Sequence, residues 1–161
     1  MCSIAGFDCS IKTWGDVAAI ATILGGAGIF LALLQLRHQS EVARSTFENL
    51  FVVQYQQLIQ RLPIMALLGN ELGDEDRKKY LREFYHYVDL CNTQAYHRAQ
   101  GRVSAATWSE WKDGIEANFR RPELKLVWAY IAAKSPDEFS DLRAVAPPGP
   151  LDDQNPYSRL A

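Results

Sequence analysis

The strongest constraint on this chain is the run from Val17 to Leu34, which has no charged side chain and a single polar residue, Thr22. With its flanking residues it makes a helix of about 30 Å at ~1.5 Å per residue, which matches the hydrocarbon core of a bilayer. Its large apolar side chains favour insertion by roughly 0.3 to 0.6 kcal/mol each, or about 3 to 5 kcal/mol together. We therefore predict a transmembrane helix over residues 13–36.

The flanks of the run support this prediction. Asp16 and Arg37 lie where charged side chains reach the headgroups, and Trp14 lies where an interfacial indole is favoured. A cleaved signal peptide would have a basic start and a small-x-small cleavage site, and neither is present. A buried helix of a soluble protein is the other alternative. Lys12 precedes the run while Arg37 and Arg44 follow it, which predicts that the rest of the chain lies in the cytoplasm.

After the run, apolar residues recur at helical spacing and no stretch alternates as a strand would. The first helix meets no breaker before Pro63, so we predict that it continues to about Leu62. Apolar periodicity and the Gly, Pro and Ser residues that interrupt it predict the remaining segments. These are a short turn over 63–68, helices from Asp74 to Gly101, from Ser104 and from Pro122, and a last helix from Ser135 to about Leu142.

The predicted fold is all-α: a transmembrane helix that continues into a cytoplasmic bundle of four or five helices over residues 37–145. Residues 1–12 and 146–161 are predicted to be a short N-terminal tail and a disordered C-terminal tail. The net charge of -2 does not indicate nucleic-acid binding. Cys2, Cys9 and Cys91 lack a metal-binding spacing, so we expect neither a metal nor a cofactor; Cys2 and Cys9 could pair outside the cytoplasm, and Cys91 is expected to be buried.

Several short motifs lie in the predicted bundle: Phe84-Tyr85-His86-Tyr87, Asp89-Leu90-Cys91-Asn92, Gly101-Arg102-Val103, Trp108 with Trp111, and Asn118-Phe119-Arg120-Arg121-Pro122 before Trp128. With the N-terminal apolar run, their order resembles small bacterial single-pass membrane proteins with a cytoplasmic helical domain, of the type classed as domains of unknown function. The resemblance covers about residues 14–145. It implies the helical fold and placement in a bacterial inner membrane, and it implies no catalytic residues.

One polar stripe in the helix from Asp74 contains residues that could carry chemistry. Glu83 and His86 have the Glu-x-x-His spacing of di-iron bundles, but such sites need a second pair, and the chain has none.

The stripe has steps of three and four residues, and two histidines with a carboxylate could form a ligand-binding or proton-sensitive site. Its members are Arg82, His86, Asp89, Thr93 and His97. The alternative is an ordinary solvated polar face.

A second candidate is the polar cluster Asn118, Arg120 and Arg121, directly before Pro122. It lies at the positive start of a predicted helix, where an anion or an acidic partner could bind. The alternative is that these residues pair internally with Glu110, Asp113 or Asp89 and fix the crossing of two helices.

The strongest interaction signal lies in the apolar run. Small residues recur at steps of three and four, at Ala18, Ala21, Gly25, Gly28 and Ala32, and the repeat continues through Gln35, Gln39, Val42 and Thr46. Small residues let helices approach closely in lipid, so another transmembrane helix, from a second copy or a different protein, is the expected partner beside the bilayer itself. Accidental spacing is the alternative.

Two functional classes follow from these patterns. The first is a membrane-anchored interaction or accessory protein, which self-associates or joins a larger complex. The second is a membrane-tethered enzyme or ligand sensor that uses His86, Asp89 and His97.

Overall fold

The computed structural model describes the backbone of residues 14–159 and the side chains of residues 28–159. Three predictions concern residues outside these ranges: the tail over 1–12, the pairing of Cys2 with Cys9, and the small-residue positions Ala18, Ala21 and Gly25. The chain divides into two compact units, Met1–Ala43 and Arg44–Ala161.

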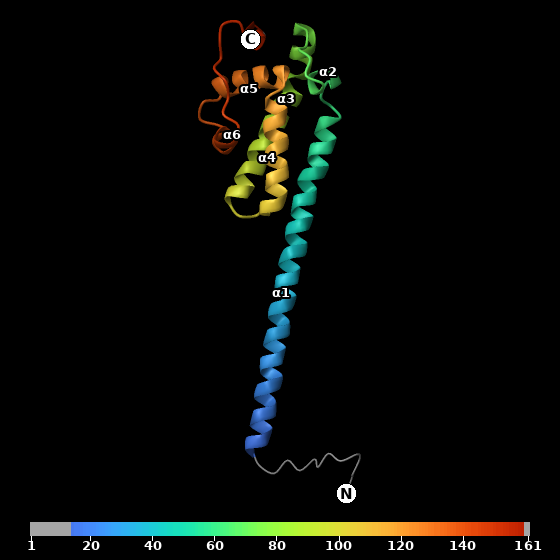
Figure 1. Cartoon of the computed structure of the whole chain (residues 1–161), viewed down its shortest axis with the longest axis vertical. Helices are drawn as coiled ribbons and strands as arrows, with labels where there is room; N and C mark the ends of the chain where they lie inside the picture. Colours follow the sequence, from blue (N-terminus) through green and yellow to red (C-terminus); the bar gives the residue numbers. More distant parts are fainter. Residues whose placement is uncertain (1–13, 160–161) are drawn as a thin grey trace. The chain divides into compact units, whose positions relative to one another are not determined.

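Every regular element in the described residues is helical, so the prediction of an all-α fold with a helical bundle is confirmed (Figure 1). The elements are α1 (Trp14–Ile59), α2 (Ile64–Leu67), α3 (Asp74–Ala99), α4 (Ala105–Phe119), α5 (Pro122–Lys134), α6 (Ser140–Val145) and the 3-10 turn η1 (Pro156–Arg159).

Helix boundaries fall where the local residues predict them. The last residue of α1 is Ile59, a few residues before Pro63. After α3, Gly101 has the left-handed φ of 70° that glycine adopts without strain. The Ser104 hydroxyl accepts from the backbone N–H of Thr107 and caps α4, and Pro122 is the first residue of α5.

One predicted helix start is wrong. The helix α3 begins at Asp74 as predicted, with Gly73 as its N-cap residue. The last helix begins at Ser140 instead of Ser135, because Phe139 adopts a left-handed φ of 60° and is buried. Its ring packs 5.9 Å from the Trp128 ring, between centroids, and Arg143 donates to the carbonyls of Ala132, Ser135 and Glu138. Tertiary packing therefore overrides the local capping signal here.

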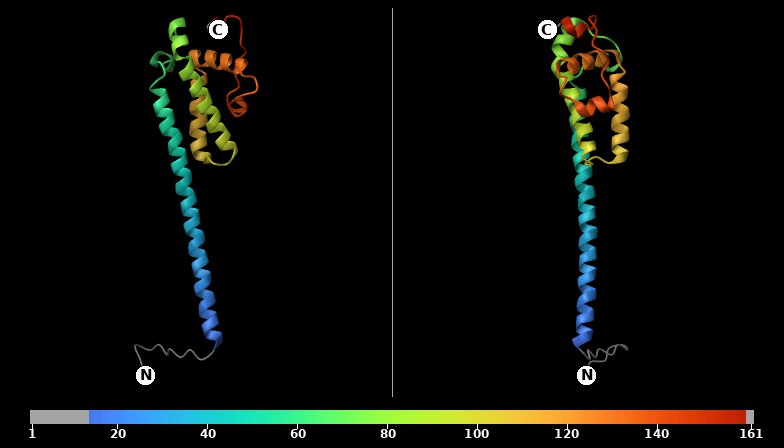
Figure 2. Two further views of the ribbon diagram at one scale, coloured as in Figure 1. Left: turned by 180° about the vertical axis from the view of Figure 1, so that it is seen from behind. Right: turned by 90° about the vertical axis from the view of Figure 1, so that its left-hand side faces the viewer.

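The core of the Arg44–Ala161 unit forms where α3, α5 and α6 meet. Figure 2 shows α5 crossing α3 near the end of α4. Trp128 is buried at this crossing, and its indole N–H donates to the Ala146 carbonyl at 2.9 Å. Phe84, Val88, Leu124 and Leu142 surround it as fully buried side chains.

The C-terminal segment adds to this core, in contrast to the predicted disorder from residue 146. Asn155 and Tyr157 are only 2% and 0% exposed. The Asn155 amide donates to the Leu126 carbonyl at 3.0 Å, and the Tyr157 hydroxyl donates to the carboxylate of Glu123. These polar contacts with α5 order a segment whose own composition gives no sign of structure.

Glu123 is the buried ionic centre of the unit, with a side chain that is 0% exposed. Its carboxylate accepts from the Arg77 guanidinium at 3.0 and 3.1 Å, from the backbone N–H of Leu72 at 2.8 Å, and from Tyr157. Burial acts to lower the pKa of Arg77, but the hydrogen bonds and charge of Glu123 outweigh it and raise that pKa. The network ties α3, α5 and the C-terminal segment together.

Among the described residues, no helix is both long enough and apolar enough to cross a membrane. The predicted span from Val17 to Leu34 lies outside the described side chains except for residues 28–34. In the described remainder of the apolar run and its flank, the large side chains are between 46% and 66% exposed: Ile29, Phe30, Leu31, Leu33, Leu34 and Leu36.

Candidate functional site

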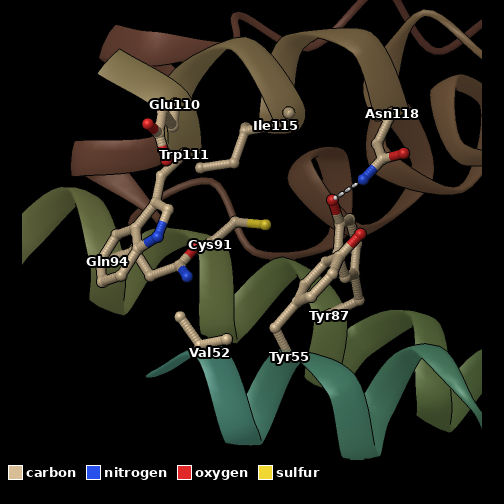
Figure 3. A pocket seen from close by; sticks show the side chains of 10 residues that line it. Val52, Tyr55, Tyr87, Cys91, Gln94, Glu110, Trp111, Ile115 and Asn118 are labelled. Carbon is tan, nitrogen blue, oxygen red and sulfur yellow. Dashed lines mark hydrogen bonds between the residues drawn. The ribbon is translucent and has the colours of Figure 1, made fainter. Parts of the chain in front are cut away.

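The Arg44–Ala161 unit contains a cavity of about 260 Å³ where α1, α3 and α4 face one another. Figure 3 shows its lining side chains converging from the three helices. The lining residues are Val52, Tyr55, Tyr87, Cys91, Gln94, Glu110, Trp111, Gly114, Ile115 and Asn118.

Aromatic rings form the walls of the cavity, and two small residues leave the space between them. The rings of Tyr55 and Tyr87 lie 6.4 Å apart, between centroids, on one side, and Trp111 stands on the other. Cys91 contributes only its small thiol, which lies between Ile115 and Val52 in the view of Figure 3. A Cβ added to Gly114 would meet no atom within 4 Å, so the space beside this glycine is open and is not filled by a neighbouring backbone.

The cavity holds few polar groups, and they are neutral apart from the exposed Glu110. The Asn118 amide donates to the Tyr87 hydroxyl at 2.6 Å. Burial raises the pKa of the Cys91 thiol to about 12 and also raises the pKa of Tyr87 well above its usual value. A thiol with so high a pKa stays protonated near neutrality, so Cys91 contributes a neutral surface to the cavity wall.

The C-terminal part of α1 is held beside the cavity by Glu48. Its carboxylate accepts from the backbone N–H of Ser104 at 2.6 Å and from the Thr107 hydroxyl at 2.7 Å. Burial acts to raise the pKa of Glu48, but these hydrogen bonds outweigh it and the pKa is lowered. Ser104 is the N-cap residue of α4 and Thr107 lies in its first turn, so the Glu48 carboxylate joins α1 to the start of α4.

The Glu48 contact should make part of the domain's stability depend on pH. A carboxylate whose folded pKa lies below its unfolded value of 4.5 stabilises the fold above pH 4.5. That contribution is lost as the pH falls through the folded pKa. We expect Glu48→Gln to cost about 1 to 2 kcal/mol at pH 7 and to flatten the fall in stability below pH 4.5.

Urea unfolding of the full chain in detergent micelles, followed by tryptophan fluorescence between pH 3 and 7, measures this effect. The exposed Glu75 on α3 supplies a matched control, Glu75→Gln, which should leave the profile unchanged. A Glu48→Gln profile parallel to that of the parent at every pH would contradict the prediction.

The predicted stripe on α3 is not gathered into one site. His86 and Asp89 are exposed, as is Arg82, while Thr93 and His97 are half-buried. His97 packs against the Phe47 and Phe51 rings of α1, at centroid distances of 5.0 and 5.5 Å. Burial, and then the nearby Arg102, lowers its pKa. Eleven residues separate His86 from His97, about 16 Å along a helix.

The described residues provide no cluster of three His, Cys, Asp or Glu side chains that could hold a metal ion. Glu83 is half-buried, and its Oε2 atom has no hydrogen-bond partner. His86, its predicted companion, is exposed beside the Tyr85 ring. The Glu-x-x-His spacing is therefore not part of a larger ligand set in this part of the chain.

The predicted anion cluster is also divided. Asn118 lines the cavity and is bonded to Tyr87, whereas Arg120 is exposed and pairs with Glu116 at 3.2 Å. Arg121 is the N-cap residue of α5. The internal ion pair that Arg120 makes is thus with Glu116, and not with Glu110, Asp113 or Asp89 as the sequence suggests.

Arg120 also lines a second hollow of about 400 Å³, beside Pro122 and the C-terminal segment. Lys125 lines the same hollow, as do the acidic residues Glu71 and Asp152. Two cations and two anions give this surface no net charge, so it does not favour an anionic ligand.

Sequence patterns predict a binding role for only one of the cavity residues, Asn118. Gln94, Tyr55 and Trp111 belong to helix faces whose spacing resembles ordinary core packing, and the cavity appears only when three helices are brought together. No protein-family model, curated protein or solved structure matches this chain, so its own residues and geometry are the basis for assigning a function.

Proposed function

We propose that the protein is a membrane-anchored accessory protein, with α1 as its single span and a helical domain that binds a partner at the cytoplasmic face. The observation that carries the proposal is the exposure of six large apolar side chains over residues 29–36 of α1, each at least 46% exposed.

These side chains cover most of the helix circumference. Successive residues of an α-helix point about 100° apart, since a turn contains about 3.6 residues, so the apolar residues at 29, 30, 31, 33, 34 and 36 cover roughly 220° of it. The remaining arc holds the uncharged residues Gly28, Ala32 and Gln35, so no charged side chain interrupts this part of the helix. A helix surface of this kind belongs in a protein core or in a bilayer. The uncharged sequence upstream, from Val17, has the length that a bilayer requires.

Membrane extraction tests the anchor. The full chain, expressed in bacteria, should remain in the membrane pellet after alkaline carbonate treatment and should be released by detergent. A chain that carbonate releases is peripheral, and that result would overturn the proposal.

The orientation is tested by thiol labelling of intact cells. Cys2 and Cys9 precede the span, so after reduction with a membrane-impermeant reductant, which opens any disulfide between them, a membrane-impermeant maleimide should label them from outside if the domain is cytoplasmic. Cys91 is buried in the core and supplies the internal negative control. If the two cysteines are labelled only after the cells are lysed, the N-terminus lies inside the cell and the proposed orientation is wrong.

Partner recovery tests the accessory role. The tagged full chain, crosslinked in native membranes and purified in detergent, should retain itself or a specific membrane protein. We expect the same partner to be lost when the span is replaced by an unrelated transmembrane helix, because the small-residue face is part of the contact.

Self-association should depend on that face. Replacing both Gly25 and Gly28 with Leu would separate two closely packed helices, so we expect crosslinked dimer to fall by about fivefold to thirtyfold, the equivalent of ~1 to 2 kcal/mol. The measurement is disulfide-independent crosslinking in native membranes, quantified by immunoblot.

The matched control places the same two Leu residues at Gly26 and Ala27, beside the proposed face. This control should crosslink as the parent does. Equal crosslinking of all three proteins would remove the small-residue face from the mechanism, while leaving the membrane anchor untouched.

A further inference from the structure

We propose that the cavity between α1, α3 and α4 binds a small uncharged aromatic molecule of two fused rings that carries one N–H or O–H donor. Every lining residue lies in the Arg44–Ala161 unit. The proposal therefore goes beyond the membrane anchor and does not depend on it.

The size of the cavity sets the size of the ligand. An apolar protein cavity of about 150 Å³ stays dry and accepts benzene. The space here is about 260 Å³, which leaves room for a second fused ring. Ile115 above, Val52 below and Cys91 between them in the view of Figure 3 supply apolar contacts for such a molecule.

The walls suit an aromatic ligand. Tyr55 and Tyr87 stand on one side of the cavity and Trp111 on the other, as Figure 3 shows. Trp111 is itself held by Phe51, with ring centroids 5.6 Å apart. Offset and edge-to-face contacts with rings favour another aromatic ring over an aliphatic chain of the same volume.

Gln94 supplies the polar contact. The residue is only 5% exposed and lines the cavity beside Trp111, and its amide makes no hydrogen bond in the part of the chain that the structure describes. The amide atoms are not fully enclosed, so solvent reaches them from the cavity. A ligand that fills the cavity would exclude that solvent, and a ligand donor directed at the Gln94 oxygen would keep the amide paired.

The charges around the cavity exclude anions. Its lining contains no Lys, Arg or His, and its single charged residue is the exposed Glu110. A carboxylate or phosphate would lose its hydration without gaining a cation, which is costly. The ligand is bound unchanged, since the cavity presents no activated nucleophile.

Fluorine NMR of the full chain in detergent micelles, with 5-fluoroindole as the probe, tests the proposal. A separate bound resonance is expected, and competition should rank indole above indene, its analogue without the N–H, by about tenfold in affinity. Indole-3-acetate should not compete. Absence of a bound resonance, or competition by the anion equal to that of indole, would overturn the proposal.

Gly114→Leu should fill the mouth of the cavity without a steric clash and lower probe affinity by at least about tenfold. The matched control is Ala117→Leu, an exposed position on the same helix outside the lining, which should bind normally. All variants share the same micelles, so partitioning of the probe into detergent cancels. Equal binding by both variants would place the probe elsewhere and overturn the proposal.

Gln94→Leu isolates the hydrogen bond. It replaces an amide that makes no hydrogen bond within the described part of the chain with an apolar side chain of similar size, so the fold should tolerate it. We expect indole and indene to compete equally for this variant. A tenfold preference for indole that survives the substitution would contradict the role assigned to Gln94.

Discussion

Replacing Glu123 with Gln is expected to lower the free energy of unfolding of the helical domain by about 3 to 5 kcal/mol, because it leaves the buried Arg77 guanidinium without its counter-ion. Arg77 is 6% exposed, and its Nε and Nη2 atoms both donate to the Glu123 carboxylate. Its other partners, Asp74 and Glu71, are exposed acids at the surface, which cannot compensate fully.

The substitution also affects two neutral donors. The Leu72 N–H and the Tyr157 hydroxyl both donate to the carboxylate, and an amide at residue 123 can accept through only one of its two terminal atoms. Burial, followed by the hydrogen bond and charge of Glu123, raises the pKa of Tyr157, so its hydroxyl remains a donor near neutral pH. The NH₂ group of the amide in the Glu123→Gln variant would therefore face a donor where the carboxylate oxygen of Glu123 accepts a hydrogen bond, and that hydrogen bond would be lost.

Urea unfolding of the full chain in detergent micelles, followed by tryptophan fluorescence, measures the loss, since Trp128 lies in the same core. The matched control is Glu116→Gln. Glu116 pairs with Lys112 and Arg120 near the surface of α4, so its loss should cost no more than about 1 kcal/mol. Similar costs for the two substitutions would show that the buried network is not the main tie to the C-terminal segment.

Local sequence signals were sufficient for most of the secondary structure. A helix ends where glycine must adopt a left-handed φ, as at Gly101, and begins where a hydroxyl can cap it, as at Ser104. The spacing of Leu124, Val127, Trp128 and Ile131 also predicts the inward face of α5, and all four are buried. These rules depend on residues within one or two turns of each other.

Contacts between distant residues explain what those rules missed. The sequence places Glu123 in the first turn of a helix, where an acidic residue is favourable. It also lies four residues before Val127, on the buried face of that helix, and this spacing could have predicted that the carboxylate is buried. Its partners could not be predicted in this way, because Arg77 and Tyr157 lie 46 and 34 residues away in the sequence. Likewise, the cavity arises from Cys91 and Gly114, small residues of separate helices, and only the packed structure brings them together.

Introducing Arg at both Leu24 and Gly28 is expected to abolish membrane insertion. Both positions are within three residues of the middle of the Val17–Leu34 run, where each Arg costs about 2.5 to 3.5 kcal/mol on insertion scales. Together they oppose insertion by about 5 to 7 kcal/mol, which exceeds the ~3 to 5 kcal/mol that the apolar residues contribute. The sign of the insertion free energy therefore reverses.

Carbonate extraction of bacterial membranes measures the outcome: the double variant should move from the pellet to the soluble or aggregated fraction. The control introduces two Arg residues at Leu50 and Val53, exposed apolar positions on α1 beyond the span, and should leave the chain in the pellet. If both pairs release the chain, added charge anywhere on α1 is sufficient and the run is not a span. If neither does, the chain is held in the membrane by something other than insertion of this run.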